Sequence, residues 1–207
     1  MMPHQLHIIG LTGGIATGKS TCCRLIRQEH PELVLFDADA CVKGLYEKTS
    51  VVGELKTYFG GGLMLPCGGI DKAYLRQCVC ADPSAKSFLE QVFHPRVIKE
   101  CLALLSKSAK NPSSRLFVAD VPLLFEIGFD IGQSANLLVA TSRKTQVDRL
   151  KKRNAWDDDT VDAMLSSQMH IDAKLALADV IFWNEGPVEI LRAQCRRWIQ
   201  SLGIHPS

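Results

Sequence analysis

Short apolar runs alternate with stretches of helical periodicity along most of the chain. Five runs have the length and apolar character of buried strands. They span His7 to Leu11, Leu33 to Phe36, Leu116 to Val121, Asn136 to Ala140 and Val180 to Trp183. Strands that alternate with helices are typical of a parallel sheet with helices on its faces. We therefore expect an α/β fold built on a parallel five-stranded sheet.

Helical patterns fill the segments between these runs. Ser20 to Gln28 and Val188 to Leu202 each carry apolar residues on one side, as helices that cover a sheet do. The segment from about residue 40 to residue 115 is longer than one crossover helix needs. It holds further helical patterns at Asp71 to Cys80 and Pro83 to Leu105. We predict an inserted helical subdomain over residues 40–115.

A second extra segment follows the fourth strand and spans residues 143–170. It begins with the basic stretch Arg143 to Arg153 and continues through three aspartates into a new helical pattern. We predict that this segment is a small lid. Because 207 residues fit one domain with insertions better than two independent domains, we expect a single domain over residues 1–207.

Composition and charge limit the classes of partner that the protein can bind. The chain has 24 basic and 22 acidic residues, a net charge of +2, so it lacks the global positive field of nucleic-acid-binding proteins. It has no apolar run of membrane-spanning length and no visible secretory signal. The eight cysteines form no C-x-x-C pair. We expect a reduced cytoplasmic protein, monomeric or weakly self-associating, without membrane or nucleic-acid partners.

One motif carries a specific chemistry. Gly13-Gly14-Ile15-Ala16-Thr17-Gly18-Lys19-Ser20 matches G-x-x-x-x-G-K-[ST], and it follows a predicted strand and precedes a predicted helix. Such a P-loop turns its backbone amides toward phosphate oxygens, aided by the helix N-terminus. We expect these residues and Thr21 to bind ATP, with Lys19 on the phosphates and Ser20 on magnesium. The alternative is a glycine turn that binds no ligand.

Other residues favour a small-molecule kinase among P-loop proteins. The chain lacks the guanine-reading N-K-x-D and the transporter motif L-S-G-G-Q. Arg149 and Arg153 lie four residues apart, on one face of a predicted helix, where kinases related to nucleoside monophosphate kinases carry lid arginines. A solvated basic helix would explain this stretch equally simply. We predict a P-loop fold of the nucleoside-monophosphate-kinase type.

The second predicted strand leads into Asp37-Ala38-Asp39. Ligand sites of parallel sheets form beyond the carboxyl ends of the strands, so both carboxylates could face the ligand. A kinase that phosphorylates an alcohol needs an oxygen acceptor that orients the hydroxyl and takes its proton. Asp39 is our candidate for this role, and capping of the following helix is the alternative.

Together these residues resemble the dephospho-coenzyme A kinases, from about Ile8 to Leu202. The shared motifs are Gly10 to Ile15 leading into the P-loop, Phe36-Asp37-Ala38-Asp39, Leu75-Arg76, His94-Pro95, Asp120-Val121-Pro122-Leu123-Leu124-Phe125-Glu126, Arg149-x-x-x-Arg153, Gln168, Lys174, Ala178-Asp179 and Asn184-x-Gly186. The resemblance implies transfer of the γ-phosphoryl group of ATP to the 3'-hydroxyl of dephospho-coenzyme A, with magnesium.

The resemblance also implies residue roles on the ATP side. Arg149 matches the lid arginine, which makes it catalytic together with Lys19. Asn184 and Gly186 would lie beside the adenine of ATP. Asp120 would hold magnesium through water, and a structural role for Asp120 at the Pro122 turn is the alternative.

On the acceptor side, the resemblance makes Asp39 the catalytic aspartate. Arg76, His94 and Leu123 would contact dephospho-coenzyme A, although His94, before a proline in a helical pattern, could equally be a structural residue. Two other functions stay open. One is a P-loop kinase for a nucleoside monophosphate or a sugar acid, and the other is a regulatory nucleotide-binding protein without turnover.

Overall fold

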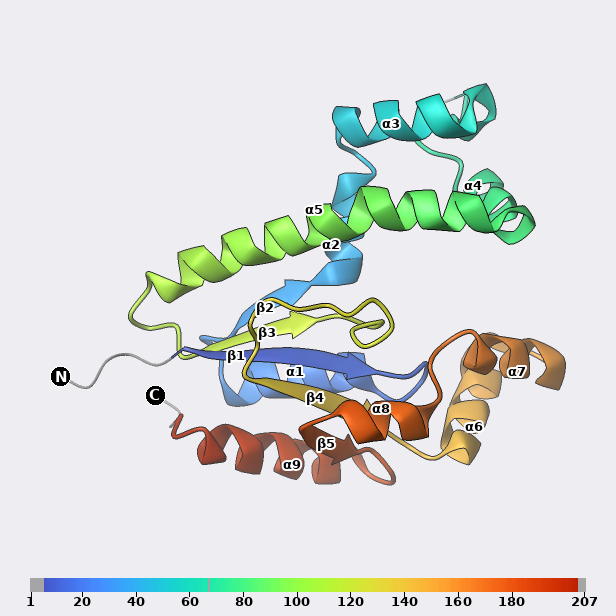
Figure 1. Cartoon of the computed structure of the whole chain (residues 1–207). Coiled ribbons are helices and arrows are strands. Elements are labelled where there is room, and N and C mark those ends of the chain that lie inside the picture. The colour runs from blue at the N-terminus through green and yellow to red at the C-terminus, as the bar shows by residue number, and fades with distance from the viewer. Residues whose placement is uncertain (1–5, 67, 205–207) are drawn as a thin grey trace. The chain divides into compact units, whose positions relative to one another are not determined.

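The computed structural model describes residues 6–66 and 68–204 (Figure 1). Contacts divide the chain into two compact units, one made of the segments up to Asp37 and from Leu104 onward, the other of Ala38–Ala103. Cys67 and the N-terminal residues 1–5, which entered the expectations on cysteines and secretion, lie outside the described residues.

The first unit is built on a five-stranded parallel sheet. Its strands are β1 (His7–Gly13), β2 (Val34–Asp37), β3 (Leu116–Asp120), β4 (Ala135–Ala140) and β5 (Val180–Trp183). The spatial order is β2-β3-β1-β4-β5, and every neighbouring pair is parallel. The predicted α/β fold with five parallel strands is confirmed. β1 lies at the centre, so the loop that follows it leaves the middle of the carboxyl edge.

Two helices cover one face of this sheet. α1 (Lys19–Glu29) and α9 (Val188–Ser201) pack against each other, and α1 also contacts β1 while α9 contacts β5. The core between helices and sheet consists of alternating strand residues and the apolar stripes of both helices. It includes Ile9, Leu11, Cys22, Leu25, Ile26, Leu116, Val118, Leu137, Val139, Phe182, Leu191, Cys195, Trp198 and Ile199. The alternation places the odd-numbered residues of β1 and β4 on this face.

Three further helices follow β4 in the chain. α6 (Arg143–Asn154) begins at the N-cap Ser142, and α7 (Asp158–Ser166) begins at the N-cap Asp157; in both cases the cap side chain accepts an amide N–H. α8 (Ile171–Leu177) packs against β4. α6 and α7 make up most of residues 143–170, the predicted lid, and α8 lies between this segment and β5.

The second unit is helical. It contains α2 (Ala38–Leu45), α3 (Thr49–Phe59), the short η1 (Gly61–Leu63), α4 (Lys72–Ala81) and most of α5 (Pro83–Ala109). α5 continues through the internal Pro95. The rings of Tyr58 and Phe88 stack with centroids 3.9 Å apart, and ion pairs join Lys48 to Glu100 at 2.6 Å within the same unit. The sequence predicted α4 and α5, referred to α2 only as the helix that Asp39 could cap, and named no helix at α3.

Within the part of the chain that the structure describes, no helix combines the length and the apolar character needed to cross a membrane.

Candidate active site

The loop between β1 and α1 has the backbone form of a phosphate cradle. Ala16 and Gly18 both have positive φ angles, 60° and 98°, and such left-handed residues turn successive amides toward one side. A Cβ atom on Gly18 would lie 2.2 Å from Nδ2 of Asn184, so only glycine fits there. Among the described residues, no acceptor receives the backbone N–H of Gly18, Lys19 or Ser20. These amides are therefore free to bind an anion.

Lys19, the first residue of α1, lies at the end of the loop. Its ammonium group forms an ion pair with Asp120 at the end of β3, with Nζ 2.5 Å from Oδ1. The other carboxylate oxygen of Asp120 accepts from the Cys23 thiol at 3.2 Å. Burial raises the pKa of Cys23 further, which keeps it protonated as the donor. The β1 and β3 ends thus bring the predicted Lys19 and Asp120 together.

Arg149 of α6 reaches the same loop. Its Nη1 donates to the backbone oxygens of Ala16 and Thr17 at 3.0 and 3.1 Å, and its Nη2 donates to the oxygen of Asn184 at 3.0 Å. The Asn184 side chain, which follows β5, donates to the oxygen of Thr17 at 2.7 Å. The structure therefore joins the P-loop, α6 and the β5–α9 loop at one place. Arg153, one turn further along, is exposed and donates to Asn154.

Glu185 fixes the start of α6, and no sequence signal had marked it. Its carboxylate accepts from Thr141 Oγ1 at 2.8 Å, from the Ser142 amide at 2.6 Å and from Thr145 Oγ1 at 2.7 Å. These hydrogen bonds, those from Ser142 first, lower the pKa of Glu185 to about 2. The charged carboxylate also lies at the positive end of the helix dipole, which holds α6 next to the β5–α9 loop.

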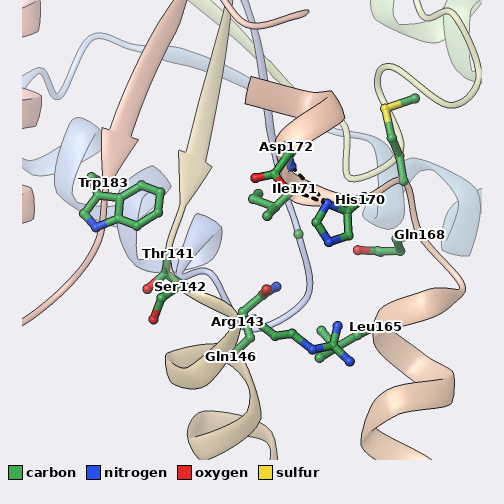
Figure 2. A pocket seen from close by; sticks show the side chains of 12 residues that line it. Thr141, Ser142, Arg143, Gln146, Leu165, Gln168, His170, Ile171, Asp172 and Trp183 are labelled. Carbon is green, nitrogen blue, oxygen red and sulfur yellow. Dashed lines mark hydrogen bonds and ion pairs between the residues drawn. The ribbon is translucent and has the colours of Figure 1, made fainter. Parts of the chain in front are cut away.

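A pocket of about 310 Å³ opens beside the P-loop (Figure 2). It is lined by residues from the end of β4, the start of α6, the α7–α8 connection and β5. They are Gly14, Thr141, Ser142, Arg143, Gln146, Leu165, Gln168, Met169, His170, Ile171, Asp172 and Trp183. Figure 2 shows the Trp183 ring on one side and His170 and Gln168 on the other. This mixture of one aromatic ring, amides and hydroxyls suits an organic ligand with polar groups.

The remaining predicted residues lie elsewhere. Gly186 has a φ of 82° in the β5–α9 loop, and Leu123 is 40% exposed after β3. Asp39 is in the first turn of α2, two residues after the end of β2. In the helical unit, exposed Arg76 lies on α4 and half-buried His94 on α5.

The donor set suits magnesium that arrives with a nucleotide. The described residues contain no cluster of three His, Cys, Asp or Glu side chains able to hold a metal ion. Magnesium, however, is commonly held by one or two protein oxygens, waters and substrate phosphates. The Ser20 hydroxyl, in the first turn of α1, and the Asp120 carboxylate, at the end of β3, are hard oxygen donors of that kind. The residues present fit the ion.

Comparisons with known proteins agree on one family. A family model described as dephospho-CoA kinase matches residues 7–189. A dephospho-CoA kinase of Anaeromyxobacter dehalogenans is 36% identical, with 95% of this chain and 92% of the relative covered. One from Fusobacterium nucleatum is 30% identical, with 96% and 100% covered.

Solved structures give the same picture. A structure from Thermus thermophilus has a TM-score of 0.80 at 30% identity and covers 96% of this chain and 98% of its own. The dephospho-CoA kinase from Campylobacter jejuni has a TM-score of 0.70 at 26% identity, with 94% and 96% covered. A shikimate kinase from Bacteroides thetaiotaomicron, at 15% identity and a TM-score of 0.51, shares the fold.

Proposed function

The chain belongs to the dephospho-CoA kinase family, and we propose that it transfers the γ-phosphoryl group of ATP to the 3'-hydroxyl of the dephospho-CoA ribose. This reaction is the last step of coenzyme A synthesis. The observation that carries the ATP half of the proposal is the P-loop, whose amides at residues 18–20 have no hydrogen-bond acceptor among the described residues. The acceptor half rests on the family.

Lys19 and the loop amides bind the ATP phosphates. Lys19 forms an ion pair with the buried Asp120 carboxylate, which holds the ammonium group beside the loop amides. The ATP phosphates carry more negative charge than one carboxylate and offer Lys19 charge-assisted hydrogen bonds. Binding of this kind acts in both the ground state and the transition state, and it lowers the barrier as negative charge shifts toward the bridging oxygen.

Arg149 adds a second positive charge to this end of the loop. Its three hydrogen bonds leave the guanidinium fixed against the backbone of Ala16 and Thr17. Two N–H groups of the five on a guanidinium remain for a phosphate or for the nucleotide base. Asn184 and Gly186, on the loop that Arg149 also contacts, form the side of the site assigned to adenine.

Asp39 orients the acceptor hydroxyl and takes its proton. It lies two residues after the end of β2, and ligand sites of parallel sheets form beyond such strand ends. The resemblance to the family assigns Arg76, His94 and Leu123 to binding of dephospho-CoA. Magnesium, bound by Ser20 and through water by Asp120, would neutralise phosphate charge when present. Cytoplasmic location and a monomeric or weakly associated state belong to the same proposal, and sedimentation velocity measures the latter.

One experiment tests the reaction itself. Purified protein is incubated with ATP, magnesium and dephospho-CoA, and the products are identified by mass spectrometry. The expected product is coenzyme A, formed in equal amount with ADP. A panel with nucleoside monophosphates and shikimate tests the other kinase function, and tight ATP binding without any acceptor-dependent ADP would favour the regulatory alternative.

A further inference from the structure

We propose that Gln146 and Gln168 are positioning residues that hold the P-loop in its phosphate-binding form by fixing both polar groups of Ile15. The Gln168 side-chain oxygen accepts from the Ile15 amide at 3.0 Å, and the Gln146 side-chain nitrogen donates to the Ile15 oxygen at 2.7 Å. We call these two glutamines the Ile15 clamp. The inference rests on the proposed function for its turnover readout and on the P-loop alone for its binding readout.

The residue after Ile15 explains why a clamp is needed. Ala16 has a φ of 60°, a left-handed conformation that costs free energy for any residue except glycine. Such a conformation persists where the surroundings hold it. Gln146 holds the oxygen before Ala16, and Arg149 holds the oxygen of Ala16 itself. Both peptide groups that flank the strained residue are therefore fixed from α6.

The P-loop contains amides that are hydrogen-bonded within the protein and amides that are not. The Ile15 N–H is directed to Gln168, whereas the N–H groups of Gly18, Lys19 and Ser20 have no acceptor within the described chain. If Ile15 turned, the backbone up to Gly18 would turn with it. The side-chain bonds to Ile15 thus decide where the anion-binding amides point.

Gln168 lies on a connection that is itself anchored. The amide of the next residue, Met169, donates to Glu126 at 3.2 Å, and Glu126 forms an ion pair with Lys174 at 2.8 Å. The Lys174 side chain is completely buried and also donates to the oxygen of Pro122 at 3.4 Å. Because the Lys174 ammonium group is buried, loss of its partly buried partner Glu126 would leave an unpaired charge in the interior. The position of Gln168 is built into the fold.

The two clamp residues come from opposite ends of residues 143–170. Gln146 is in the first turns of α6, and Gln168 follows α7; both line the pocket beside Gly14 (Figure 2). Both ends of this segment therefore contact the same P-loop residue, Ile15. A shift at either end changes the loop that binds phosphate.

Methionine variants test the clamp because methionine keeps the length of glutamine and removes its hydrogen bonds. The matched control is Gln133→Met: Gln133 likewise accepts from an amide, that of Ile131 at 2.9 Å, and donates to an oxygen, that of Phe129 at 3.1 Å. It does so in the loop that precedes β4, away from the P-loop. Binding of a non-hydrolysable ATP analogue is measured by calorimetry without acceptor, together with melting temperature, kcat and KM for ATP.

We expect Gln146→Met and Gln168→Met each to weaken analogue binding about fivefold, the scale of one hydrogen bond, and to lower kcat about tenfold. The double variant should lose less than the product of the two effects, because both bonds act on one residue. Gln133→Met should lower the melting temperature and leave binding and kcat within twofold. Clamp variants that match this control would overturn the proposal.

Glutamate variants give a second, chemically opposite test should a methionine variant fail to fold. Gln168→Glu keeps an acceptor for the Ile15 amide, whereas Gln146→Glu places a carboxylate against the Ile15 oxygen. We expect analogue binding to fall more in Gln146→Glu, and equal or reversed losses would overturn the clamp. A wild-type protein that binds the analogue but makes no coenzyme A would refute the proposed function and leave the clamp to be decided by binding.

Discussion

Replacing Arg149 with methionine removes a guanidinium that holds three backbone oxygens. Two belong to the P-loop residues Ala16 and Thr17, and the third belongs to Asn184. Methionine has similar length and retains the packing of the aliphatic stem. The substitution therefore removes the charge and its hydrogen bonds from the junction between α6, the P-loop and the β5–α9 loop.

The size of the effect follows from these bonds. Arg149 is half-buried, so water partly replaces the lost donors, and about 1 kcal/mol per bond is appropriate. Three bonds give about 3 kcal/mol, which corresponds to roughly a hundredfold fall in kcat/KM for ATP. Arg149→Lys keeps the charge and one donor direction at most, since an ammonium lacks the planar fork. We expect kcat/KM for ATP to fall roughly tenfold in Arg149→Lys.

A coupled assay that follows ADP formation, with ATP varied at saturating dephospho-CoA, measures the loss. The control is Lys152→Met, which removes one positive charge from the same helix at an exposed position. Analogue binding by calorimetry separates weaker nucleotide affinity from slower transfer. Turnover by Arg149→Met within twofold of Lys152→Met would refute the assignment of Arg149 to the ATP site.

Three other changes test separate parts of the structure. Asp39→Asn should keep ATP-analogue binding and lower kcat about a hundredfold, and a near-normal kcat in the ADP assay would remove Asp39 from proton transfer. The pKa of Glu185, lowered from 4.5 to about 2, stabilises the fold above pH 4.5, and this stabilisation is lost as the pH falls toward 2. The melting temperature of the wild-type protein should therefore exceed that of Glu185→Gln by less at pH 3 than at pH 5. An unchanged difference would contradict the lowered pKa of Glu185. Burial raises the pKa of Cys101 to about 12, so a thiol reagent at pH 8 should label exposed Cys80 first, and equal rates by mass spectrometry would contradict the buried environment.

The sheet could be predicted because its strands carry their own signal. The run Leu116 to Ala119 is apolar throughout, since strands of a parallel sheet are buried on both faces, and every residue of β3 is buried. The bounds of α2 and α3 could not be predicted because each helix has only two buried residues. Their periodicity is too weak to stand out in a single sequence.

Within the candidate site, the sequence revealed functional residues that are consecutive in the chain, but not those that are far apart in sequence. The P-loop is eight consecutive residues with a known mechanism, and Lys19 and Ser20 came with it. Gln146 and Gln168 bond to Ile15 across 131 and 153 positions of sequence. A single glutamine carries no local pattern that separates such a partner from a solvated surface residue. Their role emerges only from tertiary contacts.

Gly18 shows how the two kinds of information meet. Its place in the motif calls for glycine on conformational grounds, and its φ of 98° agrees. The fold adds a second requirement, because the Asn184 side chain donates to Thr17 through the space that a Cβ on Gly18 would fill, 2.2 Å from Nδ2. Any side chain at position 18 would displace Asn184 as well as strain the loop. The phosphate cradle is thus a local motif in sequence but a tertiary assembly in space, which is why its shape depends on α6 and on the loop after β5.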